Sequence, residues 1–216
     1  MKQSRSILIV LCLPFLFCGQ AHAQHSGPYI GGFIGGNALM NAESSDALGS
    51  FELKFKPALQ GSAVAGWDIA HGNSLGEGRI ELEYSRRNSP LDRVKFAEGS
   101  FDGGGDVTAD SLLLNFFGVL HDNSRWSPYV GAGIGAARIE ASGLTVTGSS
   151  LGSGSATVFA YQLGAGIDVA LTDYLNLDLG YRFFSSVKPK FIEANGQTFA
   201  MDYVSHNVVL GLRVGF

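Results

Sequence analysis

The sequence is poor in cysteine, in charge and in long apolar runs. Its two cysteines are Cys12 and Cys18, charged residues make up 16% of the chain, and the formal net charge is −4. After residue 17 no apolar stretch approaches the ~20 residues of a membrane helix. These shortages exclude a helical membrane domain and a basic surface for nucleic acid. We identify no amphipathic helix and expect no cofactor and no metal.

The N-terminus has the pattern of a secretory signal peptide. Lys2 and Arg5 precede an apolar run at residues 7–17, and Ala21 and Ala23 form an A-x-A cleavage site. This pattern predicts a signal peptide at residues 1–23 and one mature domain at residues 24–216. Because both cysteines precede the cleavage site, the exported domain should have no disulfide and no cysteine-ligated metal.

The rest of the chain alternates apolar and polar residues in segments of about ten. In the last segment Val208, Leu210, Leu212, Val214 and Phe216 share one face. A period of two is typical of a β-strand. The eight predicted strands are residues 29–38, 58–69, 78–86, 110–120, 127–139, 157–170, 175–185 and 205–216.

Long and short connections alternate between these segments. Residues 39–57, 87–109, 140–156 and 186–204 form long connections rich in Gly, Ser, Asp and Asn, and the links between them are short. Membrane barrels have long extracellular loops and short periplasmic turns, and ten tilted residues at ~3.3 Å each span roughly 25 Å of apolar bilayer. The sequence therefore predicts an all-β fold, a transmembrane eight-stranded antiparallel up-and-down β-barrel with four exposed, solvated loops.

Three features favour a membrane barrel over a soluble one. Glycines such as Gly131, Gly133 and Gly135 crowd the polar face, where a narrow lumen needs small residues. The apolar face carries no charge across its middle. Aromatic residues gather at its two ends, as in the girdles of membrane barrels. The predicted girdle residues are Tyr29, Trp67, Tyr84, Trp126, Tyr174 and Tyr181.

Charged residues on the polar face are candidates for a lumen network. Inside a barrel such groups must pair or stay hydrated. We expect an internal ion-pair network in which Arg182 and Arg213 meet some of the acids; a narrow polar path for ions or small solutes is the alternative. The predicted network is Asp68, Arg79, Glu81, Glu83, Asp168, Asp178, Arg182 and Arg213.

Three other groups of residues are candidates for a site. Asp102, Asp106 and Asp110 lie among glycines and could hold Ca²⁺, but their spacing does not fit an EF-hand and a solvated loop is expected. His206 with Ser205 or Asp202 is the one local candidate for an enzyme site at the outer rim, without a hydrolase motif. The arginines at 86, 87 and 138 are expected near the outer rim, where they would meet lipopolysaccharide phosphates.

Four stretches resemble a known family. Residues 28–36 (PYIGGFIGG), 126–137 (WSPYVGAGIGAA), 159–184 (FAYQLGAGIDVALTDYLNLDLGYRFF) and 207–216 (NVVLGLRVGF) are similar to OmpA-like eight-stranded outer-membrane barrels of the bacterial surface-antigen and opacity type. The resemblance implies export to the outer membrane of a Gram-negative envelope. It also implies that the assembly machinery reads the terminal strand ending in Phe216.

These observations predict a monomeric outer-membrane barrel with a structural or surface-interaction role. Its extracellular loops would meet host or envelope ligands, and its wall would meet outer-membrane lipid and lipopolysaccharide. A narrow channel is the alternative function, and a lipid- or protein-modifying enzyme is a third.

Removing Phe216 should impair assembly more than it changes the folded barrel, because the terminal aromatic is expected to act as a signal. Quantitative immunoblotting of outer-membrane fractions measures the assembled amount. Normal membrane levels of the deletion variant would show that Phe216 is only part of the girdle.

Overall fold

The computed structural model describes residues 27–45, 50–69, 77–120, 124–193 and 198–216. The predicted signal peptide lies outside these ranges, so it stays a prediction. The described residues form twelve β-strands, which make up one antiparallel sheet. In the described part of the chain, no helix has the length and hydrophobicity needed to cross a bilayer.

Eight strands form a closed ring, which confirms the predicted fold class. Each strand pairs antiparallel with its neighbours, and β1 pairs β12 from Tyr29↔Gly215 to Leu39↔Ser205, so the last strand closes the barrel against the first. The strands of this membrane ring, in order around it, are β1 (Gly27–Leu39), β4 (Ala58–Ile69), β5 (Glu77–Phe96), β6 (Gly99–Val119), β7 (Trp126–Val146), β8 (Ser149–Ala170), β9 (Leu175–Ser186) and β12 (Val204–Gly215).

Four of these strands are about twice as long as a bilayer requires. Strands β5 to β8 have 20 to 22 residues each, so most of the connections expected at residues 87–109 and 140–156 are strand and not solvated loop. The β5–β6 pair ends in a two-residue turn at Ala97–Glu98, and the β7–β8 pair ends in one at Thr147–Gly148. Thr147 and Gly148 both have positive φ, of 49° and 81°, as a type I′ hairpin turn requires.

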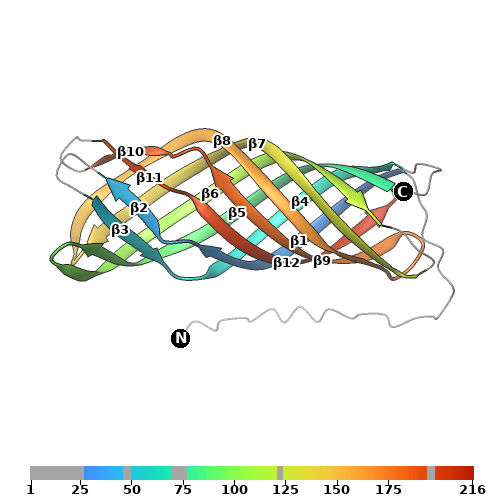
Figure 1. Ribbon diagram of the computed structural model, residues 1–216, viewed down its shortest axis with the longest axis horizontal. Helices are drawn as coiled ribbons and strands as arrows, with labels where there is room; N and C mark the ends of the chain where they lie inside the picture. Colours follow the sequence, from blue (N-terminus) through green and yellow to red (C-terminus); the bar gives the residue numbers. More distant parts are fainter. Residues whose placement is uncertain (1–26, 46–49, 70–76, 121–123, 194–197) are drawn as a thin grey trace, which may run out of the picture.

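The other two long connections also contain strands. They supply β2 (Ala42–Ser45), β3 (Ser50–Phe55), β10 (Lys190–Glu193) and β11 (Thr198–Met201). These pair in the order β5-β3-β2-β11-β10-β8 and, with β6 and β7, close a second eight-stranded ring. Figure 1 shows the short strands at the end of the barrel opposite the C-terminus. Since long connections are extracellular in membrane barrels, we refer to this second ring as the extracellular ring.

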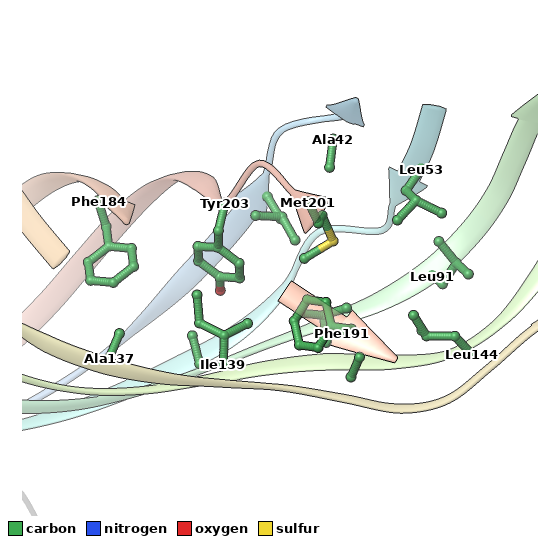
Figure 2. Packing of buried hydrophobic residues seen from close by; sticks show 14 of the residues in the cluster. Ala42, Leu53, Leu91, Ala137, Ile139, Leu144, Phe184, Phe191, Met201 and Tyr203 are labelled. Atoms are coloured by element: carbon green, nitrogen blue, oxygen red, sulfur yellow. The ribbon is translucent and has the colours of Figure 1, made fainter. Parts of the chain in front are cut away.

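The two rings differ in the kind of side chain that points inward. The membrane ring exposes Ile34, Leu114, Ile134, Leu163 and Leu210, and it buries charged and amide side chains such as Arg79, Glu83 and Asn115 in its lumen, as a bilayer demands. The extracellular ring instead encloses an apolar core (Figure 2), so the lumen is not polar throughout as the sequence suggested. The largest members of this extracellular core are Leu39, Phe51, Leu53, Leu91, Val94, Val107, Ile139, Leu144, Phe184, Phe191, Met201 and Tyr203.

Glycines in the membrane ring make room for large lumen side chains. A Cβ on Gly66 would overlap the Tyr29 ring, and a Cβ on Gly166 or Gly180 would overlap the Tyr129 hydroxyl. A narrow eight-stranded interior can therefore hold two tyrosines because the facing positions carry no side chain.

Substituting Gly66 with alanine should lower the free energy of unfolding by about 1–3 kcal/mol, because the new methyl group forces Tyr29 to move in a packed interior. Gly32→Ala is the matched control, since a Cβ there meets no atom within 4 Å and faces outward. Urea titration of both variants in lipid vesicles provides the comparison. Equal stability of the two variants would contradict the close contact described here.

Candidate functional site

The periplasmic half of the lumen holds a compact ion-pair cluster. Arg79 places Nη1 2.7 Å from Asp168 and Nε 2.8 Å from Glu81. Arg213 places Nη2 2.6 Å from the same Asp168 oxygen and Nη1 3.7 Å from Asp68. The structure therefore brings together five of the predicted network residues.

The strand register brings two acids side by side, and both arginines are needed to compensate their charges. Asp168 on β8 and Asp178 on β9 are direct register partners, and both side chains are buried. Two carboxylates side by side repel each other unless cations compensate them. Arg79 and Arg213 approach Asp178 at 3.7 Å each, so the two guanidiniums bridge the two acids.

Two tyrosines complete this cluster. Tyr129 donates its hydroxyl proton to Asp178 at 2.6 Å and accepts a hydrogen bond from Arg182 Nη1 at 3.0 Å. Arg182 thus reaches an acid through Tyr129, whereas a direct ion pair was expected. Tyr29 donates to Glu81 at 2.7 Å and is 2% exposed, so its assignment to the girdle is wrong.

Aromatic rings separate the charged groups within the lumen. The Arg79 guanidinium lies 4.9 Å from the Phe117 ring centroid and 4.5 Å from that of Tyr129. Arg182 lies 4.9 Å from the same Phe117 ring. Cation–π contacts of this kind stabilise a desolvated guanidinium, and the rings fill the space around the charges.

A second cluster lies on the extracellular side of the first, and amide side chains supply most of its hydrogen bonds. Glu83 accepts hydrogen bonds from Ser85 at 2.6 Å, from Asn115 at 2.8 Å and from Gln162 at 3.0 Å. Glu83 belongs to the network predicted from the sequence, whereas Asn115 and Gln162 do not, because the prediction considers charged residues only. Both could have been found from their place on the polar face of strands β6 and β8.

Arg87 occupies the boundary between this amide cluster and the extracellular core. It is fully buried, donates to Ser111 at 2.9 Å and to Gln162 at 3.2 Å, and stacks 4.1 Å from the Phe184 ring. The expectation that it faces lipopolysaccharide is wrong. Adjacent strand residues point to opposite faces, so Arg86 faces outward and Arg87 inward.

Tyr203 lies above Arg87, in the connection between β11 and β12. It is fully buried, and its hydroxyl makes no hydrogen bond of ordinary geometry, although Ser89 is close. Burial raises the pKa of Tyr203 to about 12, so the hydroxyl stays protonated and available as a donor at neutral pH.

The remaining girdle residues lie on the outer face. All five have side chains exposed at the surface of the membrane ring, together with Phe216. They are Trp67, Tyr84, Trp126, Tyr174 and Tyr181.

A row of charge lies just above the apolar band on the outer wall. Arg86, Asp110 and Arg138 are register partners on three consecutive strands. Arg86 lies 3.5 Å from Asp110, which also accepts a hydrogen bond from Tyr84 at 2.8 Å. Asp110 therefore belongs to a surface ion pair, and the Asp102–Asp110 stretch is part of strand β6 and not a solvated loop. Within the described residues no group of His, Cys, Asp or Glu is arranged to hold a metal ion.

The candidate enzyme residues at the outer rim do not converge. Ser205 is buried inside the barrel, while His206 faces outward and contacts the Tyr181 hydroxyl and the Met40 sulfur. Asp202 pairs with Lys188 at 2.9 Å. A nucleophile and its base must lie within hydrogen-bond reach, and these residues are committed elsewhere.

Comparison with known proteins agrees with this architecture. The chain is 25% identical over 193 residues to Putative adhesin RP828 of Rickettsia prowazekii (strain Madrid E), with 83% of this chain and 84% of that protein covered. It superposes on Neisserial surface protein A with a TM-score of 0.54 at 20% identity, covering 88% of this chain and 98% of that one.

A family model gives the assignment. Residues 8–216 match the model of the outer membrane protein beta-barrel domain, which is nearly the whole chain. An outward apolar band, an inward polar network and a closed ring of eight strands are what such a domain needs in a bilayer. The chain belongs to the outer membrane protein β-barrel domain family and is a protein of the Gram-negative outer membrane.

Proposed function

We propose that this protein is a monomeric, non-enzymatic surface-interaction barrel, which presents its extracellular ring to host or envelope ligands. The observation that carries the proposal is the second closed ring. Its strands continue those of the membrane ring, so the hairpin tips are held on a continuous sheet and not on free loops. A rigid element positions contact residues at a lower entropic cost than a flexible loop.

The tips offer a defined contact surface. The Thr147 N–H donates to the Asp102 carbonyl at 3.0 Å, which ties the β7–β8 tip to the β5–β6 tip. Phe101 is 38% exposed close to Phe96, and Ser149 and Ser150 are exposed at the β7–β8 tip. The adhesin name of the Rickettsia prowazekii relative supports an attachment role for this end.

The wall itself supports two further contacts. Arg86 and Arg138 are exposed directly above the apolar band, where lipopolysaccharide phosphates lie, and guanidinium groups bind phosphate well. Phe216 is exposed at the end of β12 and is available to the assembly machinery before the barrel closes.

The channel alternative is disfavoured by packing. Arg79, Tyr129, Phe117 and Arg182 cross the lumen in contact with one another, and the extracellular core covers them. An eight-stranded barrel has room for side chains only.

The purified protein should therefore show no large, steady single-channel current in planar bilayers. The measurement is a voltage-clamp recording at neutral pH, with Tyr129→Ala as the companion variant because it removes the side chain between Asp178 and Arg182. Steady currents from the unmodified protein would favour the channel function instead.

Substituting Phe101 with serine together with Ser149→Asp and Ser150→Asp should reduce attachment to an epithelial cell layer by about tenfold, because the tip loses its exposed aromatic and gains charge. Counting attached cells of a non-adherent host strain that displays each variant provides the readout. Thr172→Ala, in the short turn at the other end of the barrel, is the matched control and should attach normally. Attachment that is equal for all three proteins, at equal surface levels, would contradict the proposal.

A further inference from the structure

Met40 is the methionine of the mature domain that lies at the surface. The chain has three methionines, of which Met1 falls in the predicted signal peptide. Met40 is 50% exposed, whereas Met201 is 0% exposed and has its sulfur inside the extracellular core (Figure 2). Oxidants reach an exposed side chain more easily than a buried one. The two thioether groups should therefore differ strongly in reactivity.

The backbone holds Met40 at the seam where the barrel closes. The residue follows β1 directly, and its N–H donates to the Val204 carbonyl of β12 at 2.8 Å. Further along β12, the Nε2 atom of His206 lies 3.2 Å from the Met40 sulfur. Met40 is thus tied to β12 through its backbone and also through its side chain, so the sulfur has a defined place.

The His206 ring is held by its neighbours. Its Nδ1 atom lies 2.5 Å from the Tyr181 hydroxyl, and its centroid lies 5.5 Å from the Phe183 ring in an edge-on contact. The Met40 sulfur can accept a hydrogen bond but has no proton to donate. Both contacts are satisfied when the Tyr181 hydroxyl donates to Nδ1 and the Nε2–H of His206 donates to the sulfur.

This hydrogen bond makes the two lone pairs of the Met40 sulfur unequal. An oxygen added at one lone pair gives one epimer of methionine sulfoxide, and an oxygen added at the other gives the second epimer. His206 lies against one lone pair, while the side chain as a whole is exposed. An oxidant from solution therefore meets one open side of the sulfur.

We propose that Met40 is an oxidation site for hydroperoxides, at which His206 directs the oxygen to one face of the sulfur. The sulfur attacks one oxygen of the peroxide, so that an S–O bond forms and the O–O bond breaks. Sulfur loses two electrons to the peroxide, and the departing oxygen takes the proton of the transferred hydroxyl. For hydrogen peroxide the products are methionine sulfoxide and water. The site goes beyond the surface role proposed above and does not depend on it.

Oxidation would change the chemistry of the rim beside the seam. A thioether is a flexible apolar group, whereas a sulfoxide is polar and its oxygen is a good hydrogen-bond acceptor. The new oxygen would lie close to His206 and Tyr181, which face outward on β12 and β9. Met201 would stay a thioether, so the packing of the extracellular core would not change.

The first test compares the two methionines in the full mature barrel in lipid nanodiscs, treated with hydrogen peroxide. Peptide mass spectrometry follows the oxidation of each residue over time. Met40 should oxidise about tenfold faster than Met201 or more, because only its sulfur is exposed. In urea, which unfolds the barrel, the two rates should become equal. Oxidation of Met201 as fast as Met40 in the folded barrel would overturn the proposal.

The second test identifies the epimer of the product. The oxidised protein is digested, and the peptides are treated separately with the two kinds of methionine sulfoxide reductase, each of which acts on one epimer. One of the two enzymes should repair most of the Met40 sulfoxide that formed in the folded barrel, whereas each should repair about half of that formed in urea. Equal repair of the folded-state product by both enzymes would show that His206 does not direct the oxidant.

Three substitutions separate the hydrogen bond from packing. His206→Phe keeps a ring against Phe183 and removes the N–H, so Met40 should give a near-equal mixture of epimers. Met201 should stay protected in this variant, which confirms that the barrel is folded. Tyr181→Phe removes the hydroxyl that fixes the His206 proton and should lower the epimer preference about twofold. Tyr161→Phe, whose ring lies 6.4 Å from Phe183, is the matched control and should leave the preference unchanged. An undiminished preference in His206→Phe would overturn the role of His206.

Discussion

The whole structure depends on one constraint, which is that a backbone in lipid must satisfy every N–H and C=O internally. An unpaired group there costs several kcal/mol, so the sheet has to close, and β12 must meet β1. Closure at eight strands leaves a narrow lumen. That narrowness then explains the glycines opposite Tyr29 and Tyr129 and the layered filling of the interior, because only side chains of matched volume fit.

The lumen is polar in the membrane ring and apolar in the extracellular ring, because the barrel is surrounded by lipid at one level and by water at the other. In the bilayer the outer face must be apolar, so charged side chains turn inward and compensate one another around Asp168 and Asp178. Above the bilayer the outer face meets water, so the same strands turn their apolar side chains inward, as a soluble barrel does. Arg87 lies where the two regimes meet, which is why it has amides on one side and apolar residues on the other.

Much of the membrane ring could be predicted from the sequence. The second predicted strand, residues 58–69, coincides with β4, and the alternation at residues 205–216 placed Arg213 inside. Tyr29 was assigned to the wrong face of its strand because the segment is rich in glycine. With so few side chains, the alternation does not show which face is apolar. Pro28-Tyr29-Ile30-Gly31-Gly32 has few side chains to compare, and an aromatic residue close to a strand end is typical of a girdle.

The extracellular ring could not be predicted in the same way. Stretches such as Gly103-Gly104-Gly105 and Ser149-Ser150 have the composition of loops. They pair as strands because they continue membrane-ring strands whose register is already set by burial. The apolar positions Val107, Ile139 and Leu144 were visible, but they lie in segments where the membrane pattern had ended.

The sharing of β5 to β8 between the two rings has a consequence for how this surface can diversify. These four strands are constrained twice, by the bilayer around the membrane ring and by the packed core of the extracellular ring. The β2–β3 and β10–β11 hairpins, in contrast, complete only the upper ring, and each leaves and re-enters the membrane ring at the ends of its strands. Exchange or lengthening of these two hairpins would alter half of the extracellular wall without changing any register in the bilayer. Strands β5 to β8 therefore form the constrained half of the extracellular ring, and the two hairpins form the half that can change. Antigenic or ligand variation can accumulate in the hairpins at little risk to export and assembly.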